Sequence, residues 1–165
     1  MNSKIKIIDN FLDQKDYKKV IEVRNDSSWI LQSSNPNNTV EEFQFLFSDI
    51  KDDPFFIDYL FPKVANQLGK GSYILDRVYL NGQWNGREGN FHEDHCDYTG
   101  LIYISPYEYG WGGFTEILTK PEPTIIHPIP NRLLIFEGSL THKAYSFAYQ
   151  ACPLRVSLAF KINKK

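Results

Sequence analysis

The sequence has little of what identifies several protein classes. Its 165 residues include only two cysteines, Cys96 and Cys152, which are too far apart to form a paired metal-ligand motif or to imply a disulfide framework. No apolar run approaches the roughly 20 residues of a membrane span, and the apolar run within residues 1–10 is too short for a signal peptide. We therefore expect a cytoplasmic protein with no membrane partner, in which both cysteines are free thiols.

The sequence also lacks a large excess of charge of either sign. Its 18 basic and 20 acidic residues give a formal net charge of -2, and the basic residues form no cluster outside the termini. A nucleic-acid partner is therefore disfavoured, because such proteins normally carry a basic face or stripe. The hydrophobic share of 42% is ordinary for a globular protein, and the length suits one domain over residues 1–165.

The first part of the chain, residues 1–70, predicts two helices. Asp13 is a suitable N-cap for the first helix, and the apolar side of that helix would consist of Tyr17, Val20 and Ile21. The pair Asp53-Pro54 is typical of a helix start and predicts the second helix. Residues 25–42 lie between them and are rich in Asn and Ser without clear periodicity, which predicts an irregular surface loop.

The rest of the chain, residues 71–163, predicts short strands separated by turns rich in glycine, proline and asparagine. With one strand near the N-terminus, the expected strands cover residues 4–8, 73–80, 99–105, 114–119, 124–126, 132–136 and 155–162. The pair Asn81-Gly82 is read as a turn. Helices followed by many short strands predict an α+β, mainly β fold, namely a β-sandwich or jelly roll with the N-terminal helices packed on one sheet.

Residues 91–103 contain groups that can bind a metal ion. His92 and Asp94 are two positions apart, so in an extended backbone their side chains point to the same side and can close on one ion. His142 follows the strand-like run 132–136 and is the natural third ligand. Two neutral histidines and one carboxylate on one face of an octahedral ion leave the opposite face open, an arrangement associated with non-haem Fe(II) oxygenases.

A metal centre that activates O2 needs two electrons, which 2-oxoglutarate commonly supplies, and the far carboxylate of that molecule needs a cation. Arg155 follows His142 by thirteen positions, which allows one strand to end and an antiparallel neighbour to begin. Its guanidinium matches a carboxylate bidentately and stays charged when buried. Alternation places Arg155, Ser157 and Ala159 on one small, polar strand face. The same alternation in the strand 99–105 puts Thr99, Leu101 and Tyr103 on one side, so the Tyr103 hydroxyl could bond this carboxylate. Tyr103 could equally be an ordinary core residue.

A series of motifs follows in a fixed order: Asn81-Gly-Gln83, His92-x-Asp94, Tyr98-Thr-x-Leu-Ile-Tyr103, Trp111-Gly-Gly-x-Thr115, Pro130-Asn-Arg-Leu-Leu-Ile-Phe136, His142 and Arg155-x-Ser157. Together they resemble the Fe(II)- and 2-oxoglutarate-dependent oxygenases, in particular the prolyl 4-hydroxylase-like group and its compact relatives from phages and algal viruses. The resemblance is strong over residues 70–163. It implies a double-stranded β-helix of the cupin-like kind, with His92, Asp94 and His142 on iron and Arg155 on 2-oxoglutarate.

The resemblance also implies an activity. The expected reaction is hydroxylation of an unactivated C–H bond, with 2-oxoglutarate and O2 consumed, succinate and CO2 released, and ascorbate as an optional reductant. Peptidyl proline or another amino-acid-like molecule is the implied substrate. Asp94 favours hydroxylation over halogenation, because the related halogenases replace that carboxylate. The main alternative is a cupin-like jelly roll that binds a metal or a small molecule without redox chemistry.

Two points stay open at the level of sequence. Many prolyl hydroxylases have a tyrosine nine or ten residues before the first ligand, where this chain has none; the candidates for this role are Tyr79, Asn81 and Gln83. In addition, His95-Cys96-Asp97 repeats the ligand spacing. We prefer His92 and Asp94, because Tyr98-Thr99 then keeps the usual distance from the ligand carboxylate. We expect His127 to be structural.

Overall fold

The structure is a computed structural model that describes residues 5–33 and 44–165. In chain order its elements are β1 (Ile5–Ile8), α1 (Gln14–Asp26), β2 (Ile30–Ser33), β3 (Gln44–Asp49), the π-helix η2 (Phe55–Leu60), α2 (Phe61–Ala65), the 3-10 helix η3 (Asn66–Leu68), β4 (Tyr73–Gln83), β5 (Tyr98–Tyr103), β6 (Thr115–Ile117), β7 (Thr124–Ile126), β8 (Leu133–Glu137), β9 (His142–Ala144) and β10 (Arg155–Lys164). Within the described part of the chain, no helix has the length and apolar character needed to span a membrane.

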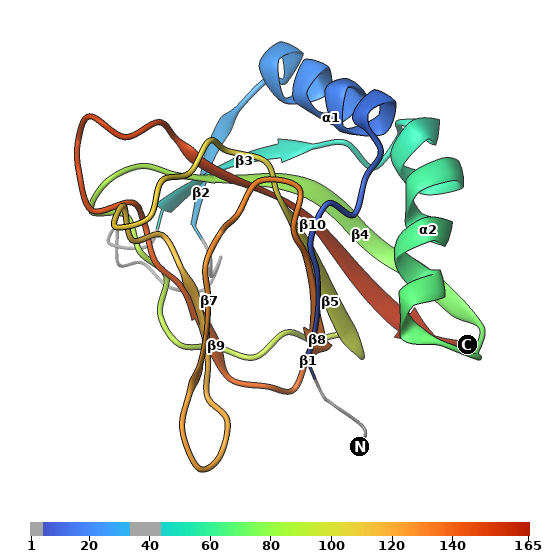
Figure 1. The fold of residues 1–165 in the computed structure, drawn as a ribbon. Coiled ribbons are helices and arrows are strands. Elements are labelled where there is room, and N and C mark those ends of the chain that lie inside the picture. Colours follow the sequence, from blue (N-terminus) through green and yellow to red (C-terminus); the bar gives the residue numbers. More distant parts are fainter. Residues whose placement is uncertain (1–4, 34–43) are drawn as a thin grey trace.

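Two antiparallel sheets form the body of the molecule. The larger has seven strands in the order β1-β8-β5-β10-β4-β3-β2, and the smaller has three in the order β7-β6-β9. Figure 1 shows α1 and α2 on the side of the larger sheet that faces away from β7 and β9. The predicted jelly roll, mainly β with its helices packed on one sheet, is therefore confirmed.

Alternation along β10 separates two cores. One side contributes Val156, Leu158, Phe160 and Ile162 to a cluster that also contains Val20, Phe56, Leu60 and Val64 from the helices. Each such side chain stabilises the fold by roughly 1.5–3 kcal/mol when fully buried. A smaller cluster lies between the sheets and consists of Tyr103, Ile117, Ile126, Leu134 and Phe136. The predicted two-residue period of β10 is confirmed, so the other side of this strand faces the space between the sheets.

Both helices begin where the sequence predicts. The Asp13 side chain accepts a 2.8 Å hydrogen bond from the Asp16 backbone N–H, which is the predicted N-cap interaction and contributes about 1 kcal/mol. The second helical segment starts at Phe55, directly after Pro54, and Asp53 accepts a 2.9 Å bond from the Phe55 N–H. These starts fix the helices that cover the larger sheet.

Several predicted boundaries were wrong. The loop expected over residues 25–42 is helical up to Asp26 and forms β2 over Ile30–Ser33, while residues 34–42 lie outside the described residues. The strand β2 has four residues, too few to show a clear period, and among the described strands it pairs only with β3. Asn81-Gly82, read as a turn, continues β4. A Cβ on Gly82 would lie 2.9 Å from Leu154, so this glycine serves close packing and not a turn.

Candidate active site

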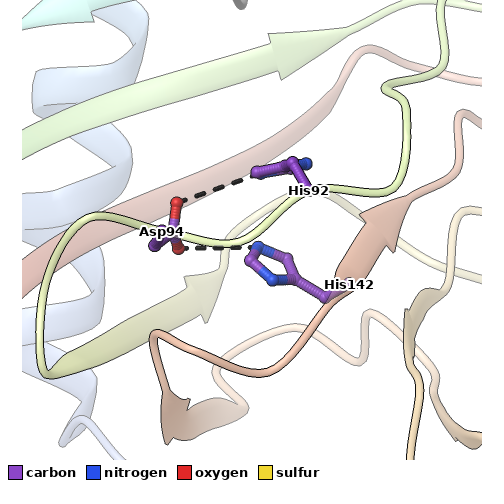
Figure 2. Close-up of side chains that lie close together, drawn as sticks. All are labelled: His92, Asp94 and His142. Carbon is purple, nitrogen blue, oxygen red and sulfur yellow. Dashed lines mark ion pairs between the residues drawn. The ribbon is translucent and has the colours of Figure 1, made fainter.

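Two histidines and a carboxylate meet beside β9. His92 and Asp94 lie in the segment that leads into β5, and His142 is the first residue of β9. One possible ligand atom from each residue lies within 4.8 Å of the others. His142 Nε2 is 3.5 Å from Asp94 Oδ2, and His92 Nε2 is 3.9 Å from Asp94 Oδ1 (Figure 2). The structure thus brings together the three residues that the sequence predicts as metal ligands.

Backbone hydrogen bonds hold these residues in place. His92 and His142 exchange two bonds, of 3.0 and 2.9 Å, and the Asp94 N–H donates to Gly138 O at 2.8 Å. Gly138 approaches the ligand segment so closely that a Cβ would lie 2.1 Å from Cys96 O. Any larger residue at this position would displace the segment that carries Asp94.

Both histidines present the same ring nitrogen to the centre. Nδ1 of His92 is 2.8 Å from Asn90 O, and Nδ1 of His142 is 2.8 Å from Leu140 O. A carbonyl only accepts hydrogen bonds, so these partners assign the proton to Nδ1 and leave each Nε2 lone pair for a metal. Burial lowers the pKa of His142 to about 4, against the opposing effect of Asp94. His142 is therefore in its neutral, ligating form at neutral pH.

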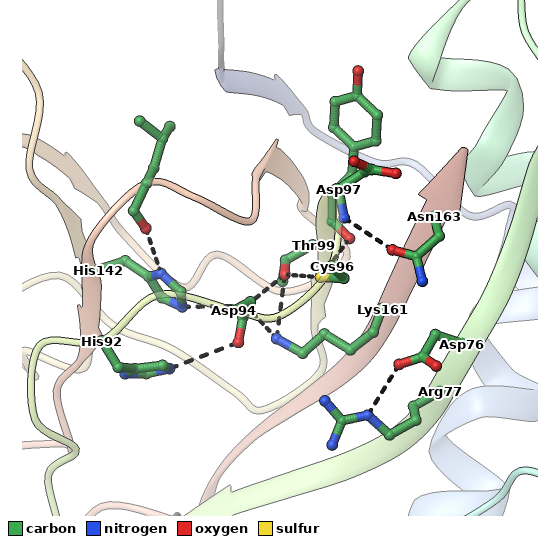
Figure 3. Close-up of polar contacts among 12 residues, drawn as sticks. Asp76, Arg77, His92, Asp94, Cys96, Asp97, Thr99, His142, Lys161 and Asn163 are labelled. Atoms are coloured by element: carbon green, nitrogen blue, oxygen red, sulfur yellow. Dashed lines mark hydrogen bonds and ion pairs between the residues drawn. The ribbon is translucent and has the colours of Figure 1, made fainter. Parts of the chain in front are cut away.

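The Asp94 carboxylate is held through one of its oxygens. Oδ2 accepts a 2.5 Å bond from Thr99 Oγ1 and another from Lys161 Nζ (Figure 3). Burial favours a higher pKa of Asp94, but the Lys161 charge and these hydrogen bonds outweigh it and hold that pKa at about 2. The donor set is two imidazole nitrogens and one carboxylate oxygen, which fits Fe(II).

The alternative pair with the same spacing lies elsewhere. Asp97 Oδ2 accepts a 2.8 Å bond from the Lys164 N–H, the Asp97 N–H donates to Asn163 at 3.0 Å, and His95 is exposed. His127 contacts the Tyr107 hydroxyl at 2.8 Å and is not part of the group that could hold a metal ion. The structure therefore places His92 and Asp94, and not the second pair, beside His142.

Arg155 lies on the inner face of β10 and is 1% exposed. Its guanidinium donates to Gly113 O at 2.6 Å, to Gln83 Oε1 at 2.7 Å and to Thr115 Oγ1 at 3.1 Å. All three acceptors are neutral, and no carboxylate within residues 5–33 and 44–165 pairs with it; burial lowers the pKa of Arg155. A buried charge without a counter-charge is unfavourable, and N–H donors remain on its fork for an anion.

The other two residues predicted for the 2-oxoglutarate pocket lie beside Arg155. The Tyr103 ring centroid is 5.4 Å from the guanidinium carbon, and its hydroxyl donates to Thr115 Oγ1 at 2.7 Å. Burial raises the pKa of Tyr103, so the hydroxyl remains a donor. Ser157 is buried and pairs with Tyr103 in the β-ladder. Arg155, Tyr103 and Ser157 thus share one face of the larger sheet.

Three residues could take the role of the tyrosine that many prolyl hydroxylases have before the first ligand, and all three lie on the same sheet face as Arg155. In the ladder between β10 and β4, Gln83 opposes Arg155, Asn81 opposes Ser157, and Tyr79 opposes Ala159. Partners across a ladder point to the same side of the sheet. Among the three, Gln83 contacts the guanidinium directly, while the Tyr79 ring packs 5.1 Å from the ring of Phe47.

Sequence reasoning assigned no role to several residues that complete the site. Lys161 contacts Asp94, and it continues the parity of Arg155 and Ser157 along β10, so the same alternation could have identified it. Thr99 shares the parity of Tyr103 on β5 in the same way. Thr115 lies on a strand of three residues, too short for periodicity to indicate which side chains face inward.

No family model matches this sequence, and no curated protein is similar to it.

Solved structures are similar in fold. One is a prolyl hydroxylase from Trichoplax adhaerens in complex with a hypoxia inducible factor oxygen degradation domain peptide fragment (TM-score 0.78, 18% identity, covering 99% of this chain and 84% of that chain). Another is a Pseudomonas putida prolyl-4-hydroxylase (TM-score 0.72, 13% identity, 99% and 94% covered). A third is HygX from Streptomyces hygroscopicus with nickel, 2-oxoglutarate and hygromycin B bound (TM-score 0.71, 10% identity, 99% and 84% covered). The predicted double-stranded β-helix of the 2-oxoglutarate–Fe(II) oxygenases is confirmed as the fold of this chain.

Proposed function

We propose that this protein is an Fe(II)- and 2-oxoglutarate-dependent dioxygenase that hydroxylates an unactivated C–H bond of a peptide or small molecule. One observation carries the proposal. Arg155 is a buried guanidinium without a carboxylate partner among the described residues, and it lies on the same face of β10 as Lys161, which contacts Asp94 of the metal group. A dicarboxylate that also binds the metal would supply the missing negative charge.

The inner face of β10 has the layout that such a ligand needs. Lys161 reaches Asp94 at one end of the strand, and Arg155 lies at the other end. These two Cα positions are roughly 20 Å apart at about 3.3 Å per residue, and both side chains are long. The inner residues between them, Ser157 and Ala159, are small. We infer that a short, flat molecule with a carboxylate at each end would lie along these small residues, between the metal group and Arg155.

Each residue then has a defined task. His92, Asp94 and His142 would hold the metal on one side and leave its other positions to ligands. Gln83 and Thr115 orient the Arg155 fork, and Thr115 in turn is fixed by the Tyr103 hydroxyl. When bound, Fe(II) with 2-oxoglutarate and O2 would supply the oxidative decarboxylation to succinate and CO2 and the oxygen that is transferred to the C–H bond.

Exposure indicates the side from which the substrate approaches. The His92 side chain is 50% exposed, whereas those of Asp94 and His142 are 10% and 6% exposed. Phe136, which is fully buried, packs on the His142 ring at a centroid distance of 4.6 Å. The C–H bond would therefore reach the centre past His92. Peptidyl proline and other amino-acid-like molecules are the substrates to test first, since one similar structure is a prolyl hydroxylase with a bound peptide.

Turnover of 2-oxoglutarate tests the proposal. Purified protein with Fe(II), 2-oxoglutarate and O2 should form succinate slowly even without a primary substrate, and Asp94→Ala should abolish this because one of three ligands is lost. Asp97→Ala is the matched control and should retain turnover, since Asp97 bonds the end of β10. Protein that is zinc-loaded or metal-free and indifferent to 2-oxoglutarate would contradict the proposal and favour the non-redox jelly roll. If turnover is found, a mass-spectrometric screen of peptides and metabolites for the gain of one oxygen atom would identify the substrate.

A further inference from the structure

Lys161 is a buried cation to which the proposed reaction gives no task. Its side chain is 6% exposed, its Nζ contacts Asp94 Oδ2, and the same Nζ lies 3.2 Å from Thr99 Oγ1. Figure 3 shows Lys161 reaching Asp94 from β10, on the side away from the two histidines. Lysine is almost never fully buried unless it is paired, so this ion pair is the reason the side chain is accommodated there.

Lys161 and a metal ion would use the same carboxylate. Oδ2 of Asp94 accepts from Thr99 and Lys161, and within the described residues Oδ1 has no hydrogen-bond donor and faces His92 Nε2. A divalent cation between the two Nε2 atoms and Asp94 would therefore lie a few ångströms from the ammonium, with Asp94 as the shared counter-charge. Two like charges at such a distance repel, so each cation weakens the hold of the other on Asp94.

We propose that Lys161 is the internal counter-ion of the metal-free site. Its ammonium keeps the ionised Asp94 carboxylate in position when no divalent cation is bound, and it competes with that cation for the carboxylate. The inference rests on the metal site of the proposed function. It implies that the site stays assembled without metal, and that metal binds less tightly than the three ligands alone would allow.

A neighbouring residue provides a matched control. Arg77 is the cross-strand partner of Lys161, so both side chains start from the same face of the larger sheet. The Arg77 side chain is 61% exposed and pairs at 3.3 Å with Asp76 instead of Asp94 (Figure 3). Removing Arg77 therefore removes a nearby positive charge without removing the counter-ion of Asp94.

The test compares Lys161→Met and Arg77→Met with the wild type, using Mn(II) as the probe. Thermal unfolding is recorded without metal and with saturating Mn(II), and Mn(II) affinity is measured by electron paramagnetic resonance. Lys161→Met should have a much lower Tm without metal, should recover most of the loss with Mn(II), and should bind Mn(II) about tenfold or more tightly than the wild type. Arg77→Met should change neither quantity appreciably.

Three results would overturn the inference. If Lys161→Met lowers Tm equally with and without Mn(II), or binds Mn(II) more weakly than the wild type, Lys161 only supports the ligand segment. A wild type that does not bind Mn(II) would overturn the metal site itself and the inference with it. These outcomes separate a failure of the inference from a failure of the proposed function.

A double variant keeps the test decisive if Lys161→Met does not fold without metal. Asp94→Asn removes the buried negative charge with little change of shape. Because the counter-ion role lies entirely in that charge, the double variant Lys161→Met/Asp94→Asn should fold without metal and unfold at a higher temperature than Lys161→Met alone. A double variant less stable than Lys161→Met alone would show that the two side chains act independently and would contradict the inference.

Discussion

Two buried cations lie on the inner face of β10, and they are partnered differently. Lys161 pairs with the Asp94 carboxylate, whereas Arg155 is held by a carbonyl, an amide oxygen and a hydroxyl. A buried positive charge is accommodated at modest free-energy cost only when a negative charge accompanies it. The Lys161 end of the strand is therefore complete in the free protein, and the Arg155 end is the one that an anionic ligand would complete.

The difference between the two ends of β10 predicts its largest effect, on 2-oxoglutarate binding, at Arg155. Arg155→Gln should weaken 2-oxoglutarate binding by at least about 2 kcal/mol, roughly 30-fold, because the variant removes one partner of a desolvated charge pair. The KM for 2-oxoglutarate in succinate formation measures this effect. Arg132→Gln is the control, since Arg132 pairs with the half-exposed Asp9 at 2.6 Å and should leave this KM unchanged. An unchanged KM in Arg155→Gln would show that the buried guanidinium is structural.

A smaller effect is expected at the Lys161 end, through the backbone. Gly138→Ala should destabilise the protein by about 1–3 kcal/mol and should weaken Mn(II) binding, because the new methyl group meets Cys96 O and displaces the segment of Asp94. Urea unfolding and Mn(II) titration measure the two changes. Gly71→Ala, whose nearest neighbours are the outer atoms of the flexible Tyr73 side chain, should leave Mn(II) binding intact. Normal Mn(II) binding by Gly138→Ala would contradict the view that this glycine positions the ligand segment.

The two ends of β10 also differ in how far the sequence predicts them: it predicts the role of Arg155 but not that of Lys161. Arg155 and Ser157 could be assigned to one face because a strand repeats every two residues, and His92 with Asp94 follow the same rule. Lys161 obeys that rule too, so alternation places it on the inner face, but a lysine is more often solvated than buried. Only the fold shows that it is buried against Asp94.

Other features depend on tertiary contacts that no local pattern indicates. Asn-Gly is among the strongest hairpin signals, yet Gly82 continues β4 because its missing side chain admits Leu154. Thr115 becomes part of the site only because β6 packs beneath Tyr103 and Arg155. The metal ligands were predictable as a set, whereas the ring orientation of each histidine depends on a backbone carbonyl two residues earlier, at Asn90 and at Leu140.

The most direct test of the account is a calorimetric titration of 2-oxoglutarate into the protein without O2, in the presence and in the absence of Mn(II). Because one end of the ligand would need the metal held by His92, Asp94 and His142, and the other would need Arg155, we expect saturable binding with Mn(II) and much weaker binding without it. Equal binding under both conditions, or none under either, would contradict the central claim that the triad and the buried guanidinium form one site.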